Sequence, residues 1–327
     1  MPPKNSKKIC ICPECKKEIK PIVKYIENVK NISEKNILSF FEYENNNIEY
    51  TYFLDSSFYI KTVQSCAIRV LLQSLSKCFD EIILKINEKG IHFLKVSDNN
   101  ILFHLKLDCN QLEYYIINKK DYCESDESDE SDELNENIYL NFNLKEMKHI
   151  LKQIKNDDIL CFQKNEKCDF WELNIQNYEK NKSSSYKFFN KINTIEEIEI
   201  ISKLFNCNLN IPFSLIDDTI KKMDILEPKD ISVIINEDSY LRFFCEKEDK
   251  TQSCENKILF NETNHIDNSF RIIIKNKYDF EKFKTVKLFI DLCMCVNIFI
   301  NQEDIIILNI NVANLGTLKI CIPPIDN

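Results

Sequence analysis

Three cysteines near the start of the chain form the most obvious group of potential metal ligands. Cys10, Cys12 and Cys15 have the spacing C-x-C-x-x-C. Thiolates bind zinc well, but a structural zinc site needs four ligands and usually takes them as two pairs. No other Cys or His follows within the first 56 residues. The pattern therefore favours a reduced, metal-free segment, with a zinc site completed from elsewhere as the weaker alternative.

Residue types that could support catalysis are present but are not arranged for it. The four histidines, His92, His104, His149 and His265, show neither metal-ligand nor triad spacing. The chain contains only two glycines, too few for a P-loop or for the G-x-G-x-x-G turn of dinucleotide-binding proteins. No nucleophile elbow or metal-hydrolase signature occurs. We therefore expect no enzyme activity and no cofactor, with an enzyme of unrecognised type as an alternative.

Cations on amphipathic helices are the strongest functional pattern in the sequence. Residues Ser65–Phe79 and Leu144–Lys155 each have helical spacing, with an apolar face opposite a polar or basic face. Basic side chains on one helix face can contact phosphates without reading bases. A merely solvated face is the alternative, and i,i+4 pairing with Asp217 and Asp218 is the simpler interpretation of the third helix. The candidate phosphate-contacting residues are Arg69, Lys77, Lys145, Lys148, His149, Lys152, Lys155, Lys221 and Lys222.

The net charge limits where nucleic acid could bind. With 43 basic and 52 acidic residues the chain has a net charge of −9. The segment 123–136 holds eight acids and no base, whereas Met1–Lys35 holds nine bases and four acids. A negative protein does not attract nucleic acid in general, so any DNA contact needs its basic residues gathered on one surface. The acidic run cannot form a core and predicts a solvated loop, in which Ser125, Ser128 and Ser131 are candidate phosphorylation sites.

The elements that position these residues follow one order twice. A strand, a helix and several short strands are predicted from Phe58 onward, and the same order returns after about residue 206, which indicates an internally duplicated α+β unit. Asn is expected to take left-handed turn positions where glycine is missing. The predicted helices are Ser65–Phe79, Leu144–Lys155, Ser214–Met223 and Phe280–Leu288. The predicted strands are Phe58–Val63, Ile82–Asn87, Ile91–Val96, Ile101–Leu107, Ile138–Asn143, Ile159–Gln163, Phe170–Ile175, Tyr186–Ile192, Leu209–Ile211, Ile231–Ile235, Tyr240–Cys245, Lys257–Phe260, Phe270–Lys275, Cys295–Ile300, Ile305–Val312 and Leu318–Ile322.

Composition also predicts the cellular environment. No apolar run reaches the roughly 18–20 residues of a membrane span, and Met1–Lys8 is polar and basic, unlike a signal peptide. We therefore expect an intracellular protein. Its 15 cysteines are then expected to be mostly buried free thiols.

Five segments in order resemble the proliferating cell nuclear antigen (PCNA) family of DNA sliding clamps. Val63-Gln64 followed by an amphipathic helix resembles the first strand and helix of the family, and both glycines fall where the family has one. The resemblance covers residues 58 to 325. The other four segments are Glu88–Ile91 with Val96–Asp98, Asn143–Lys148, Asn206–Pro212 and Val312–Lys319.

The resemblance implies an α+β fold with two tandem clamp domains, helices on one face of antiparallel sheets, and a ring-shaped homotrimer. The implied divisions are an N-terminal extension over 1–56, a first domain over 57–192, a connector over 193–206 and a second domain over 207–327. The first 56 residues and the acidic run have no counterpart in the family. The third helix carries acids near positions where the family carries bases.

The implied function is that of a sliding clamp that encircles duplex DNA, non-specifically, in DNA replication and DNA repair. It would serve as the processivity factor of a DNA polymerase and as a dock for a clamp loader and PIP-box-type peptides, in the nucleus or a viral replication compartment. Subunits would join through Tyr186–Ile192 and Lys257–Phe260. The implied peptide pocket consists of Val96, Ile101, Phe103, Ile198, Ile200, Pro323 and Pro324. The alternative is a clamp-fold interaction protein that does not encircle DNA, such as a monomeric polymerase accessory or a viral transcription factor.

Overall fold

The computed structural model describes residues 22–23, 56–117, 137–165, 168–177, 179–192, 205–236, 240–259, 274–301 and 304–325. The acidic run 123–136, the three N-terminal cysteines and His265 lie outside the described residues, as does 193–204 of the predicted connector. In the described part, no helix combines the length and the apolar character that crossing a membrane requires.

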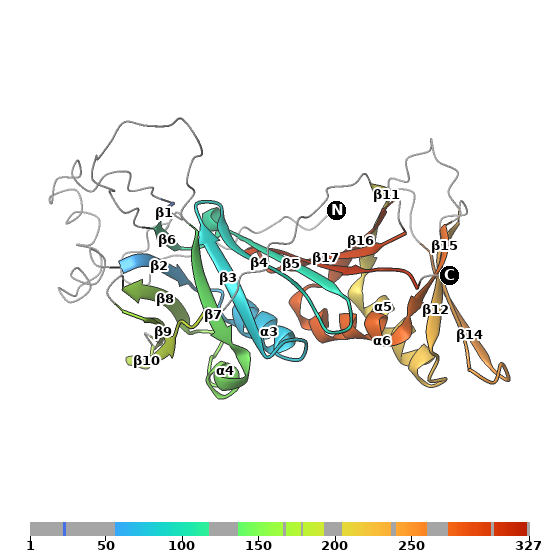
Figure 1. Ribbon diagram of the computed structural model, residues 1–327, viewed down its shortest axis with the longest axis horizontal. Helices are drawn as coiled ribbons and strands as arrows, with labels where there is room; N and C mark the ends of the chain where they lie inside the picture. Colours follow the sequence, from blue (N-terminus) through green and yellow to red (C-terminus); the bar gives the residue numbers. More distant parts are fainter. Residues whose placement is uncertain are drawn as a thin grey trace.

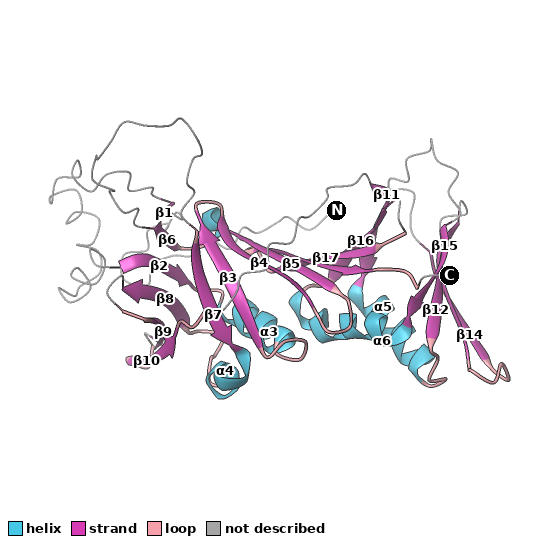
Figure 2. Ribbon diagram, viewed as in Figure 1, coloured by secondary structure: helices cyan, strands magenta, loops and turns pink. Residues whose placement is uncertain are grey.

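The described chain is a mixed α+β structure in which sheets predominate (Figure 2). The helical elements are α3 (Ser65–Leu75), η2 (Cys109–Gln111), α4 (Leu144–Leu151), α5 (Phe213–Asp224), α6 (Phe280–Lys284) and η3 (Thr285–Leu292). The strands are β1 (Ile22–Val23), β2 (Ser56–Thr62), β3 (Glu81–Asn87), β4 (Gly90–Val96), β5 (Leu102–Asp108), β6 (Tyr114–Ile117), β7 (Ile138–Asn143), β8 (Ile159–Asn165), β9 (Phe170–Asn177), β10 (Lys182–Phe189), β11 (Phe205–Pro212), β12 (Asp230–Asn236), β13 (Tyr240–Glu246), β14 (Ser253–Leu259), β15 (Ile274–Asp279), β16 (Cys295–Asn301), β17 (Ile306–Val312) and β18 (Gly316–Ile322).

One order of elements occurs four times along the chain. A strand, a helix and three strands follow one another from β2 to β5, from β7 to β10, from β11 to β14 and from β15 to β18, with β6 inserted after the first set. The first strand of each set pairs with the second strand of its neighbouring set: β2 with β8, β7 with β3, β11 with β16 and β15 with β12. Each set therefore depends on its neighbour to complete a sheet.

This pairing between neighbouring sets gives three sheets, and the largest sheet joins the two halves of the chain. The eight-stranded sheet has the order β11-β16-β17-β18-β5-β4-β3-β7, and its centre is the antiparallel pair β5 and β18. The six-stranded sheet (β1-β6-β2-β8-β9-β10) ends at β10, and the four-stranded sheet (β14-β13-β12-β15) ends at β14. Figure 1 shows these two edge strands at opposite ends of the long axis.

Helices α3, α4, α5 and α6 lie on one side of the eight-stranded sheet (Figure 1). Alternate strand residues face them, so that Phe79 after α3 packs edge-on against Phe93 of β4 and Phe103 of β5, at centroid distances of 5.5 and 5.2 Å. Phe103 also contacts Phe289 of η3, 5.8 Å away, which ties the two halves together beneath the sheet. Burying these apolar faces stabilises the fold by about 25 cal/mol per Å² removed from water.

Asparagines take left-handed positions in tight turns, as predicted, so that few glycines are needed there. Asn100 between β4 and β5 and Asn181 between β9 and β10 have φ of 53° and 51°, in the left-handed region that Asn tolerates. Both glycines lie instead against β5. A Cβ on Gly90 would stand 1.9 Å from the carbonyl oxygen of Leu107, and one on Gly316 2.0 Å from that of Lys106. Glycine is therefore required at both positions, because any side chain would collide with the backbone of β5.

The sequence predicted most of these elements, with errors at their ends. The first helix ends at Leu75 and the second at Leu151, each four residues early, because turns follow in which Cys78 N and Gln153 N donate to carbonyls three residues back. The fourth helix becomes a 3-10 helix after Lys284. Strand β6 was missed, and β10, β11 and β14 each begin four residues before the predicted start. Of the predicted strand Phe270–Lys275, residues 270–273 lie outside the described residues, and β15 extends to Asp279.

Candidate nucleic-acid interface

Helix α4 presents the clearest basic surface of the structure. Leu144, Met147 and Leu151 are buried against the sheets, and the Asn143 side chain caps the helix by accepting from Glu146 N at 3.1 Å. This cap and the buried stripe fix which residues face outward. The exposed residues of the helix and the turn after it include Lys145, Lys148, His149, Lys152 and Lys155.

Most of these α4 cations are free to meet a phosphate. Lys148, Lys152 and Lys155 form no ion pair with any carboxylate in the described residues, and the same holds for Lys77 at the end of α3. Lys145 differs, because its Nζ lies 2.6 Å from Asp80 Oδ2. Both side chains are 69% exposed, so this pair contributes little to stability and a phosphate can compete for the lysine.

Arg69 has a structural position that its helical spacing did not predict. Its guanidinium donates to the carbonyl oxygen of Ile154 at 2.6 Å and to Asn156 Oδ1 at 3.1 Å. These bonds connect α3 to the turn after α4. Arg69 therefore positions the α4 turn, and both terminal nitrogens of its guanidinium already donate hydrogen bonds within the chain.

Some lysines of the second half, unlike those of α4, are ion-paired with neighbouring acids. Lys221 of α5 is paired with Asp217 one turn earlier, which raises the pKa of the lysine, whereas Lys222 is exposed without an ion pair among the described carboxylates. The simpler interpretation of this helix as i,i+4 pairs therefore holds for Lys221.

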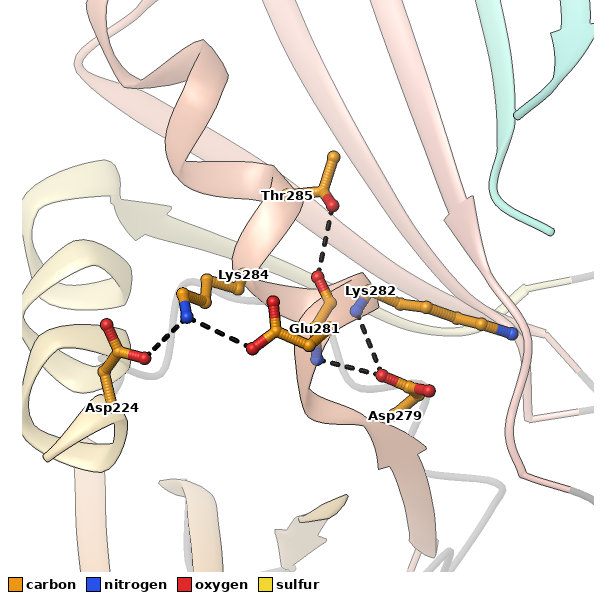
Figure 3. Close-up of polar contacts among 6 residues, drawn as sticks. All are labelled: Asp224, Asp279, Glu281, Lys282, Lys284 and Thr285. Carbon is orange, nitrogen blue, oxygen red and sulfur yellow. Dashed lines mark hydrogen bonds and ion pairs between the residues drawn. The ribbon is translucent and has the colours of Figure 1, made fainter. Parts of the chain in front are cut away.

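Lys284 of α6 repeats this neutralisation and links two helices (Figure 3). Its Nζ lies 2.7 Å from Asp224 Oδ1 at the end of α5 and 3.1 Å from Glu281 Oε1. Asp279 caps α6 by accepting from the backbone N–H groups of Glu281 and Lys282 at 2.9 and 3.2 Å. Among the described residues, the helix-side lysines without an ion pair therefore include Lys222, Lys282 and Lys287 as well as those of α4 and the end of α3.

The predicted peptide pocket falls partly on the wrong face of the sheet. Ile101 and Phe103 are 1% and 0% exposed and lie in the core on the helix side, so they do not line a surface pocket. Val96 is 41% exposed and faces the other way. Pro323 and Pro324 follow β18 and are half-buried. Ile198 and Ile200 lie outside the described residues.

The face of the eight-stranded sheet turned away from the helices carries an apolar row instead. We call it the outer row, and it crosses five strands through direct cross-strand neighbours. The pairs are Val96 with Leu102, Leu102 with Cys321, Cys321 with Ile307, and Ile307 with Phe299. All except Val96 are half-buried, and no described helix covers this face (Figure 2). The signal was present in the sequence, because Leu102 alternates in phase with the polar residues His104 and Lys106.

The two predicted subunit-contact segments overlap β10 and β14, which form free sheet edges in the described structure. Each edge ends in a large apolar side chain, Phe189 at 74% exposed and Leu259 at 79% exposed. Unpaired strand edges offer a row of backbone donors and acceptors to another chain.

The described residues contain no group of His, Cys, Asp and Glu arranged to hold a metal ion. The ten cysteines whose side chains are described are free thiols, as predicted, although only Cys109, Cys161 and Cys245 among them are fully buried. Burial raises the pKa of the Cys245 thiol to about 11, which makes it a poor nucleophile. His92 and His104 lie on the outer face of the sheet and His149 on α4.

Neither the family models nor the curated proteins contain a match to this chain.

Proposed function

We propose that this protein is a DNA sliding clamp whose copies join through β10 and β14 into a ring around duplex DNA. The observation that carries the proposal is the repetition of the strand–helix–three-strand set. The last strands of the first and fourth sets, β5 and β18, pair at the centre of the chain. The last strands of the second and third sets, β10 and β14, are their counterparts and lie at sheet edges among the described strands. The same antiparallel contact between copies would extend the sheets from chain to chain.

The position of the helices supports DNA as the occupant of such a ring. All four long helical segments lie on one side of the sheets (Figure 1), which becomes the inside if the chain curves toward them. That side carries the free lysines of α4, whereas the chain as a whole has a net charge of −9. Phosphates would be attracted to the interior without base recognition, and encirclement rather than tight binding would retain the ring.

We further propose three chains per ring, two clamp domains per chain divided near residues 193–206, and peptide docking on the outer row. The sequence resemblance to the PCNA family supports the ring of three, the two domains and peptide docking, and the apolar side chains of the outer row support that surface as the docking site. The outer row supplies an apolar strip about five strands wide for an aromatic-bearing peptide of the PIP-box type. On this proposal the protein is a processivity factor and docking platform, without enzyme activity of its own.

The decisive measurement is mass in solution combined with retention on DNA. A ring should have about three times the chain mass of 38.8 kDa, and should stay on closed circular DNA while leaving linear DNA through its ends. Changing Phe189→Asp and Leu259→Asp should reduce the mass to that of one chain and abolish the difference between circular and linear DNA. Ile225→Asp is the matched control, because Ile225 is 80% exposed at the end of α5 and lies on no free edge.

A second function remains a candidate because the ring is not needed for peptide docking. A wild-type protein that stays at 38.8 kDa at micromolar concentration and still binds a polymerase would be a clamp-fold accessory protein that does not encircle DNA. That result would reject the ring and leave the outer row as the functional surface.

A further inference from the structure

Basic side chains lie beside the outer row on the same face of the eight-stranded sheet. Lys85 of β3 is opposite His92 of β4, which is opposite Lys106 of β5. His104 of β5 is opposite Lys319 of β18. These five residues, which we call the basic strip, alternate with the core residues of their strands and therefore point away from the helices.

The lysines of the basic strip make no ion-pair contact in the described part of the chain. Lys85, Lys106 and Lys319 form no ion pair with a described carboxylate. The pKa of His92 is lowered to about 4, first by burial and then by positive neighbours that include Lys106 and Lys85. Asp108, two residues after Lys106 on β5, interacts electrostatically with Lys106 without an ion-pair contact and accepts from the backbone and side chain of Asn110 at 2.9 and 3.0 Å.

The spacing of the outer row and the basic strip is set by the strands. Residues two apart on a strand point to the same face and lie about 7 Å apart. His104 and Lys319 are therefore one such step from Leu102 and Cys321 of the outer row, and Lys106 is two steps away. A segment that places apolar side chains on the outer row would thus carry its flanking side chains over lysines.

We propose that the peptides that dock on the outer row are acidic next to their apolar anchors, and that Lys85, Lys106 and Lys319 select them. This proposal rests on the docking function proposed above and adds the chemistry of the partner. A polypeptide fits better than nucleic acid, because the apolar side chains of the outer row form half of the surface and offer nothing to a phosphate. Exposed charge pairs contribute modestly one by one, but three acting together can set partner choice.

The test compares two labelled PIP-box-type peptides that share their apolar core and differ only in flanks of four glutamates or four glutamines on each side. Binding to the full chain is measured by fluorescence anisotropy at 50 mM and 500 mM salt. We expect the glutamate peptide to bind about tenfold more tightly at low salt and within about twofold of the glutamine peptide at high salt. Equal binding of both peptides at low salt would overturn the proposal and leave docking itself intact.

Two triple variants with the same change in charge locate the effect. Lys85→Gln, Lys106→Gln and Lys319→Gln together should abolish the preference for glutamate and leave binding of the glutamine peptide unchanged. The control, Lys148→Gln, Lys152→Gln and Lys155→Gln together, changes α4 on the other side and should keep the preference. A preference that survives the first triple, or disappears in the second, would contradict the assignment.

The remaining outcomes are also distinguishable. Failure of both peptides to bind would reject docking on the outer row and with it this proposal. Binding that is unchanged by Leu102→Asp would reject both as well. A duplex of 20 base pairs that displaces the glutamate peptide, and needs the three outer lysines to do so, would make the strip a nucleic-acid surface and overturn the proposal. Tighter binding of the glutamate peptide after the acids of 123–136 are changed to amides would show that this run competes for the strip, and so support it.

Discussion

Replacing the free lysines of α4 should change how DNA binding depends on salt. We consider the triple variant Lys148→Gln, Lys152→Gln and Lys155→Gln. All three side chains are exposed and have no ion pair among the described residues, so the free energy of unfolding should change by less than about 0.5 kcal/mol per site. Any effect on DNA would therefore come from lost phosphate contacts.

The magnitude follows from counterion release. Each phosphate contact on B-DNA contributes about 0.9 to the slope of log K against log salt concentration, so loss of three contacts should lower the slope by about 2.7. Between 50 and 200 mM salt the wild-type affinity should then fall roughly 40-fold more than that of the variant. Lys221→Gln is the comparison, because Asp217 already neutralises Lys221, and its slope should change by well under 0.9.

The assay is fluorescence anisotropy of a labelled duplex at four or more salt concentrations, with thermal unfolding of each variant as the control for folding. An unchanged slope in the α4 triple would refute the placement of DNA on the helix side. If the slope falls instead when Lys85, Lys106 and Lys319 are replaced, DNA binds on the outer face of the sheet.

Three further changes test the contacts that support this surface. Arg69→Ala should lower the free energy of unfolding by about 1–3 kcal/mol, measured by urea denaturation, because it leaves the Ile154 carbonyl without its donor; an effect on DNA affinity without loss of stability would contradict its role in positioning the α4 turn. Stability should fall by up to about 3 kcal/mol as pH drops from 6.5 to 4, because the native state keeps His92 neutral with its pKa at about 4 whereas the unfolded chain binds the proton; this fall should be smaller in His92→Gln, and an identical pH profile would reject the assignment. Gly316→Ala should lower the unfolding temperature by at least about 5 °C, because its Cβ would overlap the Lys106 carbonyl oxygen at the junction of β5 and β18, and an unchanged temperature would mean that this junction adjusts without cost.

The basic residues show how much of the candidate site could be predicted from the sequence. The phase of α4 followed from its apolar stripe, so the outward position of Lys148 and Lys152 was predictable from spacing alone. The engagement of Arg69 was not, because its acceptors on Ile154 and Asn156 are 85 and 87 residues away in the chain. Neutralisation of Lys284 by Asp224 likewise depends on how α5 and α6 meet.

Local periodicity determined the α+β class, the alternation of strands with four amphipathic helices, and the repeated order of elements. These properties depend on residues close together in the chain, and the spacing of apolar residues predicts which of them are buried. Only the tertiary structure decided that β5 pairs with β18 and that, among the described strands, β10 and β14 lie at sheet edges. Those outcomes depend on pairing between strands far apart in the chain, since periodicity within one strand shows which face is buried but does not show which strand lies beside it.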